Sequence, residues 1–197
     1  MRKSLTVKNI TRIAILATLG AVLMLIDFPI FVAPGFYKMD LGDLPCLIGA
    51  FAMGPVPALF IQIIKILLKM LFKPTSTAFI GEIAAFIFSS SYCLSASIIY
   101  QNNKTKKGAV KALIIGSIVM IIVSVLANYL FIIDAYSKLY GMPLEAIIGL
   151  GQAIFPIINS KLSFVLCCVL PFNIIKVICV DLLTMLLYKH ISPILKA

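Results

Sequence analysis

The sequence predicts an all-α integral membrane protein, a bundle of six transmembrane helices forming one domain over residues 1–197. Hydrophobic residues make up 62% of the chain and charged residues 12%, whereas soluble domains keep roughly 25% charged residues. The mean hydropathy is +1.13. The apolar runs at residues 112–133 and 162–187 reach the about 20 residues that a helix needs to cross a bilayer. Because apolar and polar residues do not alternate in these runs, we expect helices and not a barrel.

The net charge of +10 reflects membrane orientation and not nucleic-acid binding. Many lysines and arginines precede the first apolar run, fill the polar loop at residues 104–111, or end the chain. Clusters of this kind mark cytoplasmic ends. We therefore expect cytoplasmic N- and C-termini and no nucleic-acid partner.

The first two helices need separate justification. Residues 13–26 are as short as a signal-peptide core, but Asp27-Phe28-Pro29 follows them in place of a cleavage site, so we expect a retained helix. Residues 44–53 would cover only half of a bilayer, at about 1.5 Å per residue. We expect this short helix to be sheltered by protein and to leave room on the outer side for a ligand.

A break between the second and third helices is predicted at Gly54-Pro55-Val56-Pro57. Proline lacks a backbone donor and disfavours helix in the preceding residue. Two helices here also give the even number of crossings that two cytoplasmic basic clusters require. The six helices are expected at about residues 11–26, 44–53, 56–72, 79–100, 109–133 and 161–190.

Two long loops, at residues 27–43 and 134–160, lie on the outer side in this topology. The first loop is rich in aromatic residues and proline, which is typical of lids and binding loops. Most acidic residues lie at or near the outer side. Asp181, near the inner end of the last helix, is expected to pack or to reach the interface.

Polar side chains inside membrane helices are costly and indicate function by default. Asn173 and Lys176 lie three residues apart in the last helix and therefore share a face. Asn128 and Tyr129 lie near the outer end of the fifth helix. Amides and one cation within apolar walls suit a neutral, flat ligand with many hydrogen-bonding groups.

Each of these residues also has a structural interpretation. Lys176 can pair with a carboxylate such as Glu82 and bind nothing, and alanine at Lys176 would then collapse the fold. Lys65 can form an outward-pointing charged face with Lys69, four residues further on. Asn128 can bond a neighbouring helix.

No pattern of catalytic or metal-binding residues is found in the sequence. It contains neither a carboxylate pair nor a serine–histidine arrangement, and His190, the single histidine, falls at the cytoplasmic end. The five cysteines lack metal-ligand spacing with this histidine and are expected to be reduced packing residues. Gly149-Leu150-Gly151 follows no strand and is not a phosphate loop. We expect no enzymatic activity, no metal and no cofactor, and any use of ATP must come from a partner.

Three motifs resemble the riboflavin-specific substrate-binding subunits (S components, RibU type) of energy-coupling factor (ECF) transporters. The longest comprises DFPI at residues 27–30 and PGFYKMDLGDLP at 34–45, with GAF and GP following at 49–51 and 54–55. The second is PFNIIK at 171–176, similar to the family's Pro-Phe-Asn-x-x-Lys, and the third is Asn128-Tyr129. The resemblance runs from about Ala14 to the last helix.

The resemblance implies high-affinity capture and uptake of riboflavin in an outward-facing pocket capped by the first outer loop. The residues implied or considered for substrate binding are Asn128, Asn173, Lys176, Met39, Asp40, Tyr129, Glu82 and Lys65. The sequence departs from the family's pattern at Ala85 and at Ile66, where asparagine is common. These changes leave open an altered affinity or a related flavin.

The resemblance also implies a location in the prokaryotic plasma membrane and two kinds of partner, a membrane coupling subunit and two ATPase subunits. In the family, small residues on the first helix contact the coupling subunit. Ala17 and Ala21 have the small-x-x-x-small spacing that allows close helix approach, and Ala14 and Thr18 extend this surface. The alternatives are an S component for another vitamin or FMN, and a non-transport membrane scaffold or small helical enzyme.

Overall fold

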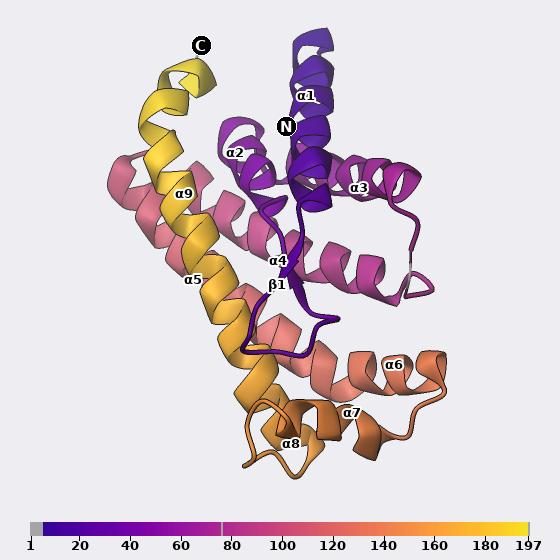
Figure 1. The fold of residues 1–197 in the computed structure, drawn as a ribbon. Helices are drawn as coiled ribbons and strands as arrows, with labels where there is room; N and C mark the ends of the chain where they lie inside the picture. Colours follow the sequence, from indigo (N-terminus) through magenta and orange to yellow (C-terminus); the bar gives the residue numbers. More distant parts are fainter. Residues whose placement is uncertain (1–5, 76, 197) are drawn as a thin grey trace.

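Helices dominate the computed structural model, which describes residues 6–75 and 77–196, with side chains described up to residue 187 (Figure 1). The mostly helical class is as predicted, with one two-stranded ladder added. The side chain of His190 lies outside the described residues. In chain order the elements are α1 Val7–Leu25, β1 Phe28–Pro29, β2 Lys38–Met39, α2 Asp43–Met53, α3 Pro55–Phe72, α4 Ile80–Asn102, α5 Lys106–Ala127, the π-helical η1 Asn128–Ile132, α6 Ile133–Tyr140, α7 Leu144–Gln152, α8 Lys161–Phe164, the π-helical η2 Val165–Val169 and α9 Leu170–Lys196.

The short helix α2 is sheltered by protein, as its length predicts. It packs against α1, α3, α4 and α9, and most of its residues are buried. Its last carbonyls find partners on α4: Ser97 Oγ donates to Ala50 O at 2.8 Å, and Gln101 Nε2 donates to Phe51 O at 3.2 Å. These bonds replace the water that a helix end in a membrane lacks.

The turn between α2 and α3 lies where the proline pair predicts it. Gly54 ends α2 with φ 100°, a conformation that L side chains rarely adopt. Pro55 occupies the first turn of α3, where its missing N–H costs nothing. Within the described residues, five helical segments are long and apolar enough to cross a membrane, and α2 is a shorter apolar helix beside them.

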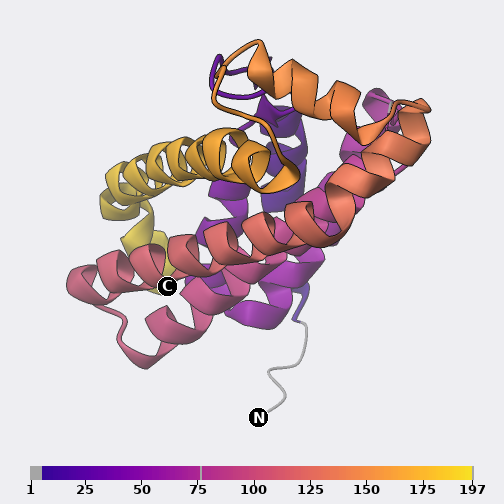
Figure 2. The same ribbon diagram turned by 90° about the horizontal axis from the view of Figure 1, so that it is seen from below.

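The fifth predicted helix extends beyond its expected end at residue 133. The segments α5, η1 and α6 form one helical stretch, Lys106–Tyr140, seen as a continuous rod in Figure 2. No proline interrupts the chain before Gly141, which has φ 59°, and Tyr136 is buried on the inner face of the added turns. The segment at residues 134–160, which was predicted to be a loop, is therefore largely helical, with α7 packed against α6.

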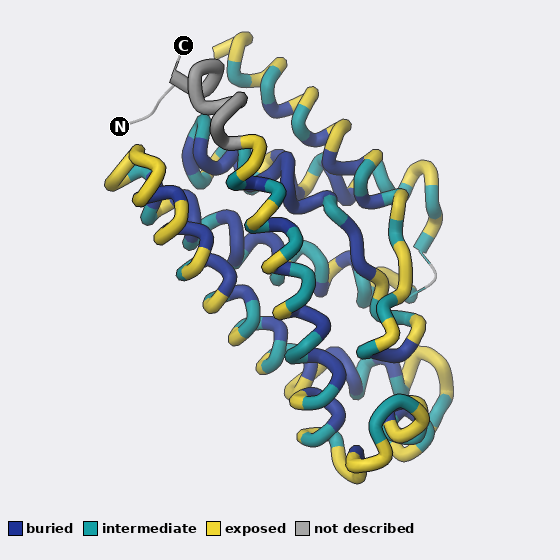
Figure 3. Tube along the Cα trace, turned by 60° about the vertical axis from the view of Figure 1, so that its left-hand side comes forward, coloured by how far each residue is buried: buried dark blue, intermediate teal, exposed yellow. Residues whose placement is uncertain are grey.

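The first turn of α1 and the last turns of α9 lie at one end of the molecule, and α6, α7 and α8 lie at the other (Figure 1). Figure 3 shows buried residues facing inward and exposed ones along the outer sides of the helices. Many exposed residues are large and apolar, among them Leu19, Ile63, Ile118 and Leu182. An exposed apolar surface of this extent is what a lipid-facing protein requires.

The predicted partner-binding surface on α1 is wrong for two of its four residues. Ala17 and Ala21 are buried in the fold with Ile13 and Met24, because α1 packs against α2 and α3 through this face. Their small side chains serve close approach within the chain. Ala14 and Thr18 are exposed on the other face of α1.

Gly116 of α5 sets the close contact between α4 and α5. A Cβ atom at this position would meet Ala96 Cβ at 3.0 Å and Tyr92 O at 3.2 Å. We expect Gly116→Val to cost about 1–3 kcal/mol of unfolding free energy, because these rigid neighbours must move. Thermal unfolding in detergent measures this, with Gly149→Val as the control because its Cβ would meet nothing within 4 Å. Equal melting temperatures for the two variants would contradict the expectation.

Candidate ligand-binding site

A cavity of about 250 Å³ lies between the loop at residues 26–42 and one end of the helical bundle. Its walls come from the ends of α3 and α4, from η1 and α6, and from α9. We call the loop at residues 26–42 the lid. The volume is slightly below the about 300–1,000 Å³ of typical ligand pockets, and the lid forms one side of the cavity.

Five of the eight predicted substrate-binding residues line this cavity. They come from the lid, α4, η1 and α9. These five residues are Asp40, Glu82, Asn128, Asn173 and Lys176.

The other three predicted residues lie outside the cavity lining. Met39 is buried in the apolar cluster around Ile132 and Val169. Tyr129 is 41% exposed on the outer surface, with Lys161 Nζ 5.4 Å from its ring centroid. Tyr129 follows Asn128 in the helix, so it points about 100° away from it.

Lys65 is deeply buried and does not point outward with Lys69. It is 1% exposed, and its Nζ donates to Asp43 Oδ1 at 2.9 Å and to Gly42 O at 3.2 Å. The first carboxylate of α2 needs a cation in this apolar setting, and Lys65 supplies it.

Asp43 is the centre of a buried ionic network beneath the cavity. Its Oδ1 also accepts a hydrogen bond from Ser89 Oγ at 2.5 Å, and its Oδ2 lies 3.2 Å from Lys176 Nζ. Lys176 in turn contacts Asp40 Oδ2 at 3.2 Å. Two carboxylates and two ammonium groups thus balance each other, as buried charges require.

Lys176 therefore has both of the roles weighed for it. It lines the cavity, and it is paired with carboxylates. Its partners are Asp40 and Asp43. The predicted pairing of Lys176 with Glu82 is wrong, because Glu82 accepts hydrogen bonds from Lys69 at 3.0 Å and from Thr75 at 2.9 Å.

The two cavity amides donate to their own helices. Asn128 Nδ2 donates to Ser124 O, and Asn173 Nδ2 donates to Val169 O, both at 2.8 Å. Asn128 begins the π-helical segment η1, and Val169, the partner of Asn173, ends the π-helical segment η2. Short π-helical segments are frequent at functional sites. The carbonyl oxygens remain for other partners. That of Asn173 has no hydrogen bond to any residue within 6–75 or 77–187, the part of the chain with described side chains.

Aromatic side chains form the apolar wall beneath the lid. The ring centroid of Phe36 lies 4.8 Å from that of Tyr37 and 5.5 Å from that of Tyr136. The ring of Tyr37 also lies 5.6 Å from that of Phe172 on α9. Burial raises the pKa of Tyr37 above its usual value, so its hydroxyl is protonated and donates.

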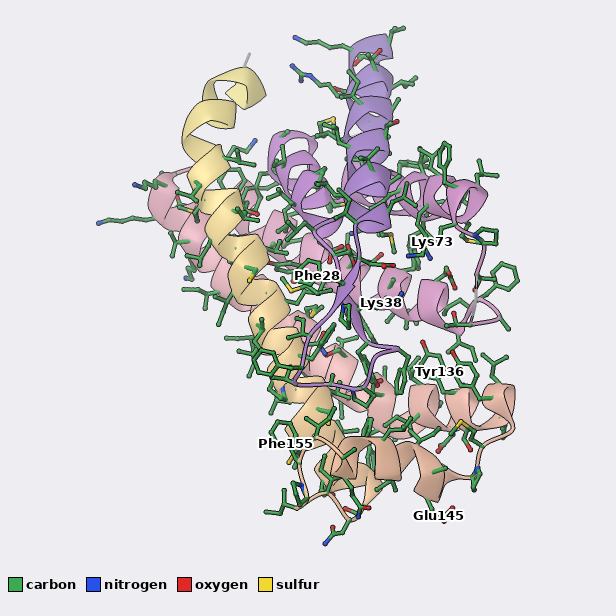
Figure 4. All side chains as sticks on the ribbon, in the orientation of Figure 1. Phe28, Lys38, Lys73, Tyr136, Glu145 and Phe155 are labelled. Carbon is green, nitrogen blue, oxygen red and sulfur yellow. The ribbon has the colours of Figure 1, made fainter. Side chains whose placement is uncertain are left out.

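Asp27 ties the lid to the rest of the protein. Its carboxylate lies 2.6 Å from Lys73 Nζ, at the end of α3, and 3.5 Å from Lys38 Nζ, in β2. Figure 4 shows Lys38, Lys73 and Tyr136 in the region where the lid crosses the bundle. Burial alone would raise the pKa of Asp27, but the two lysines hold it below its ordinary value. The pair therefore stabilises the lid at neutral pH and is lost only as the pH falls through this lowered pKa.

Several cavity residues were not predicted. Lys69 and Lys73 lie four and eight residues after Lys65, and this helical spacing was the available signal. Tyr37 was indicated only by its place in an aromatic loop, and Tyr136 gave no comparable signal. Asp181 lies away from the cavity lining and accepts hydrogen bonds from Tyr92 and from Ser117, the latter at 2.7 Å. Among the described residues, no group of three or more His, Cys, Asp or Glu side chains is placed to hold a metal ion.

Comparisons with known proteins point to one family. The family model described as "ECF transporter, substrate-specific component" matches residues 8–188. The riboflavin transporter RibU of Staphylococcus aureus (strain TCH60) is 31% identical, covering 96% of this chain and 93% of that protein. The riboflavin transporter FmnP of Bacillus subtilis (strain 168) is 26% identical, covering 95% and 93%. A solved structure of the S component of a bacterial ECF transporter aligns with a TM-score of 0.73 at 32% identity, covering 96% of this chain and 98% of that one.

The buried pair of Lys65 and Asp43 should dominate the stability of the site. Lys65→Met leaves Asp43 with less compensation in an apolar interior, and we expect a loss of about 3–5 kcal/mol of unfolding free energy. The control is Lys161→Met, because its partner Asp134 is half exposed and such pairs contribute about 1 kcal/mol or less. Chemical unfolding in detergent should show a larger loss of unfolding free energy for Lys65→Met than for Lys161→Met. Equal losses would refute a special role for the buried pair.

Proposed function

We propose that this chain, which belongs to the family of ECF transporter substrate-specific components, captures riboflavin on the outer side of the membrane for uptake into the cell. As a member of this family it is a transport protein of the bacterial membrane and not an enzyme. The observation that carries the choice of ligand is the covered cavity in which Asn128, Asn173 and Lys176 meet an aromatic wall.

The chemistry of riboflavin matches the groups that line the cavity. Its flat tricyclic ring suits the aromatic side chains of Phe36, Phe172 and Tyr136. Its imide N–H and its ribityl hydroxyls are donors for the carbonyl oxygens of Asn128 and Asn173. Its ring carbonyls are acceptors for the ammonium group of Lys176. A few placed polar groups in an apolar pocket give orientation as well as affinity.

Six crossings with both termini in the cytoplasm form part of the proposal. Five long apolar segments and the short α2 supply the six elements. The beginning of α1 and the end of α9 lie at the end of the molecule opposite α6, α7 and α8. Lys8 and Arg12 in the first turns of α1 favour the cytoplasm for that end, and this orientation leaves the lid on the outer side.

The proposed partners are a membrane coupling subunit and two ATPase subunits, which would supply the energy for uptake. The exposed Ala14 and Thr18 on α1 remain the proposed contact. Beside them is an apolar groove between α1 and α3, lined by Ile10, Phe60 and Ile64. Small residues beside a groove suit close helix packing within a bilayer.

A second candidate ligand is FMN, favoured by the lysines of the cavity. Lys38, Lys69 and Lys73 line the cavity near its edge, together with two carboxylates, Asp27 and Glu82. A phosphate on the ribityl chain would find ammonium groups there.

Riboflavin should bind to the purified chain and lose its fluorescence at micromolar concentration. We expect Asn173→Leu to weaken binding about tenfold or more, because a ligand donor loses its buried acceptor. Asn159→Leu, at an exposed loop position, is the control. A thermal-shift panel of riboflavin, FMN, thiamine and biotin identifies the preferred ligand. A wild-type chain that neither quenches nor is stabilised by either flavin would refute the proposal.

The resemblance to the family implies that the whole subunit reorients in the membrane during uptake. A disulfide between Ala14→Cys and a cysteine in the coupling subunit should then abolish riboflavin uptake, and a reductant should restore it. The same cysteines without oxidation provide the control. Undiminished uptake by the locked complex would count against reorientation.

A further inference from the structure

Tyr37 reaches from the lid to the far wall of the cavity. Its hydroxyl donates to Asn128 Oδ1 at 2.6 Å, across a separation of 91 residues. The ring lies against Phe36 of the lid and Phe172 of α9. The phenol thus places an aromatic ring and one hydrogen-bond donor in the cavity, the same two features that a flavin would bring.

The Asn128 carbonyl oxygen is buried and already engaged by Tyr37. The amide nitrogen of Asn128 is engaged by Ser124 O. The residue is 1% exposed, although an amide oxygen can accept two hydrogen bonds. A ligand donor that reaches this oxygen must first displace the Tyr37 hydroxyl.

The lid makes a second contact of the same kind. Asp40, three residues after Tyr37, contacts Lys176 at 3.2 Å. Two groups proposed to hold the ligand, Asn128 and Lys176, are therefore both engaged by polar side chains of the lid. The covered cavity leaves neither group unsatisfied, which avoids the penalty for a buried polar group without a partner.

We infer that Tyr37 is a specificity-determining residue: its hydroxyl takes the place of a ligand donor on Asn128 and yields that place when the ligand binds. The inference rests on the proposed function for the identity of the ligand. A ligand without an N–H or O–H donor at this position displaces Tyr37 and leaves the buried Asn128 carbonyl oxygen without a hydrogen-bond donor. Such ligands are rejected, because losing a buried hydrogen bond costs far more than losing apolar contact.

Replacing the hydroxyl while keeping the ring tests the inference. Tyr37→Phe removes the competing donor, so riboflavin should bind about fivefold more tightly in a fluorescence titration. The matched control is Tyr129→Phe, the neighbour of Asn128 that lies outside the cavity, and its affinity should equal that of the wild type. Weaker binding by Tyr37→Phe would mean that the hydroxyl contacts the bound ligand, and unchanged binding would mean that no competition exists. Either result overturns the inference.

A second measurement requires no ligand. Trypsin cleavage after Lys38, within the lid, should accelerate about fivefold in Tyr37→Phe relative to cleavage after Lys104 and Lys107, and should not accelerate in Tyr129→Phe. The ratio separates lid opening from general unfolding, which would accelerate both cleavages. A chain that binds no riboflavin but shows the faster lid cleavage overturns the proposed ligand and supports the lid contact. An unchanged ratio overturns the lid contact, whatever the chain binds.

Discussion

The buried ionic network around Asp43 joins most of the elements that build the cavity. Asp43 begins α2, Lys65 belongs to α3, Ser89 to α4 and Lys176 to α9, and Asp40 adds the lid. Removing one charge leaves another uncompensated in an apolar interior, so the members depend on one another. The same network supplies one wall of the cavity with a cation. Stability and ligand binding therefore share residues here, and the position of the lid is coupled to the core through Asp40.

Much of the fold could be predicted because its signals are local. Composition indicates the membrane, and the proline pair beside Gly54 locates the turn that makes α2 short. The lid ladder and the continuation of α5 into α6 were missed, because they depend on contacts distant in sequence, such as the burial of Tyr136. The spacing of Ala17 and Ala21 correctly indicates close helix approach. It cannot distinguish a neighbour in the same chain from a partner subunit.

The site was partly predictable for a similar reason. An amide or a lysine in a membrane helix can be recognised from the sequence, because placing such a polar side chain in the membrane costs free energy. This signal identified Asn128, Asn173 and Lys176. The sequence does not show how deeply such a residue is buried within the bundle. Lys65 and Lys69 share a helical face, yet Lys65 is buried below the cavity and Lys69 lines it. The ion-pair partner of each charged residue also depends on the three-dimensional fold. Glu82 pairs with Lys69, and the carboxylates that contact Lys176 come from the lid and α2.

The uninterrupted stretch from α5 to α6 has a mechanical consequence. Its 35 residues would extend about 52 Å at about 1.5 Å per residue, whereas the hydrocarbon core is about 30 Å thick. A rod this long must lean or protrude, and leaning costs only fractions of a kcal/mol per ångström of mismatch. The last turns of this stretch, α6, line the cavity with Tyr136 and Tyr140, so its excess length forms part of the ligand site.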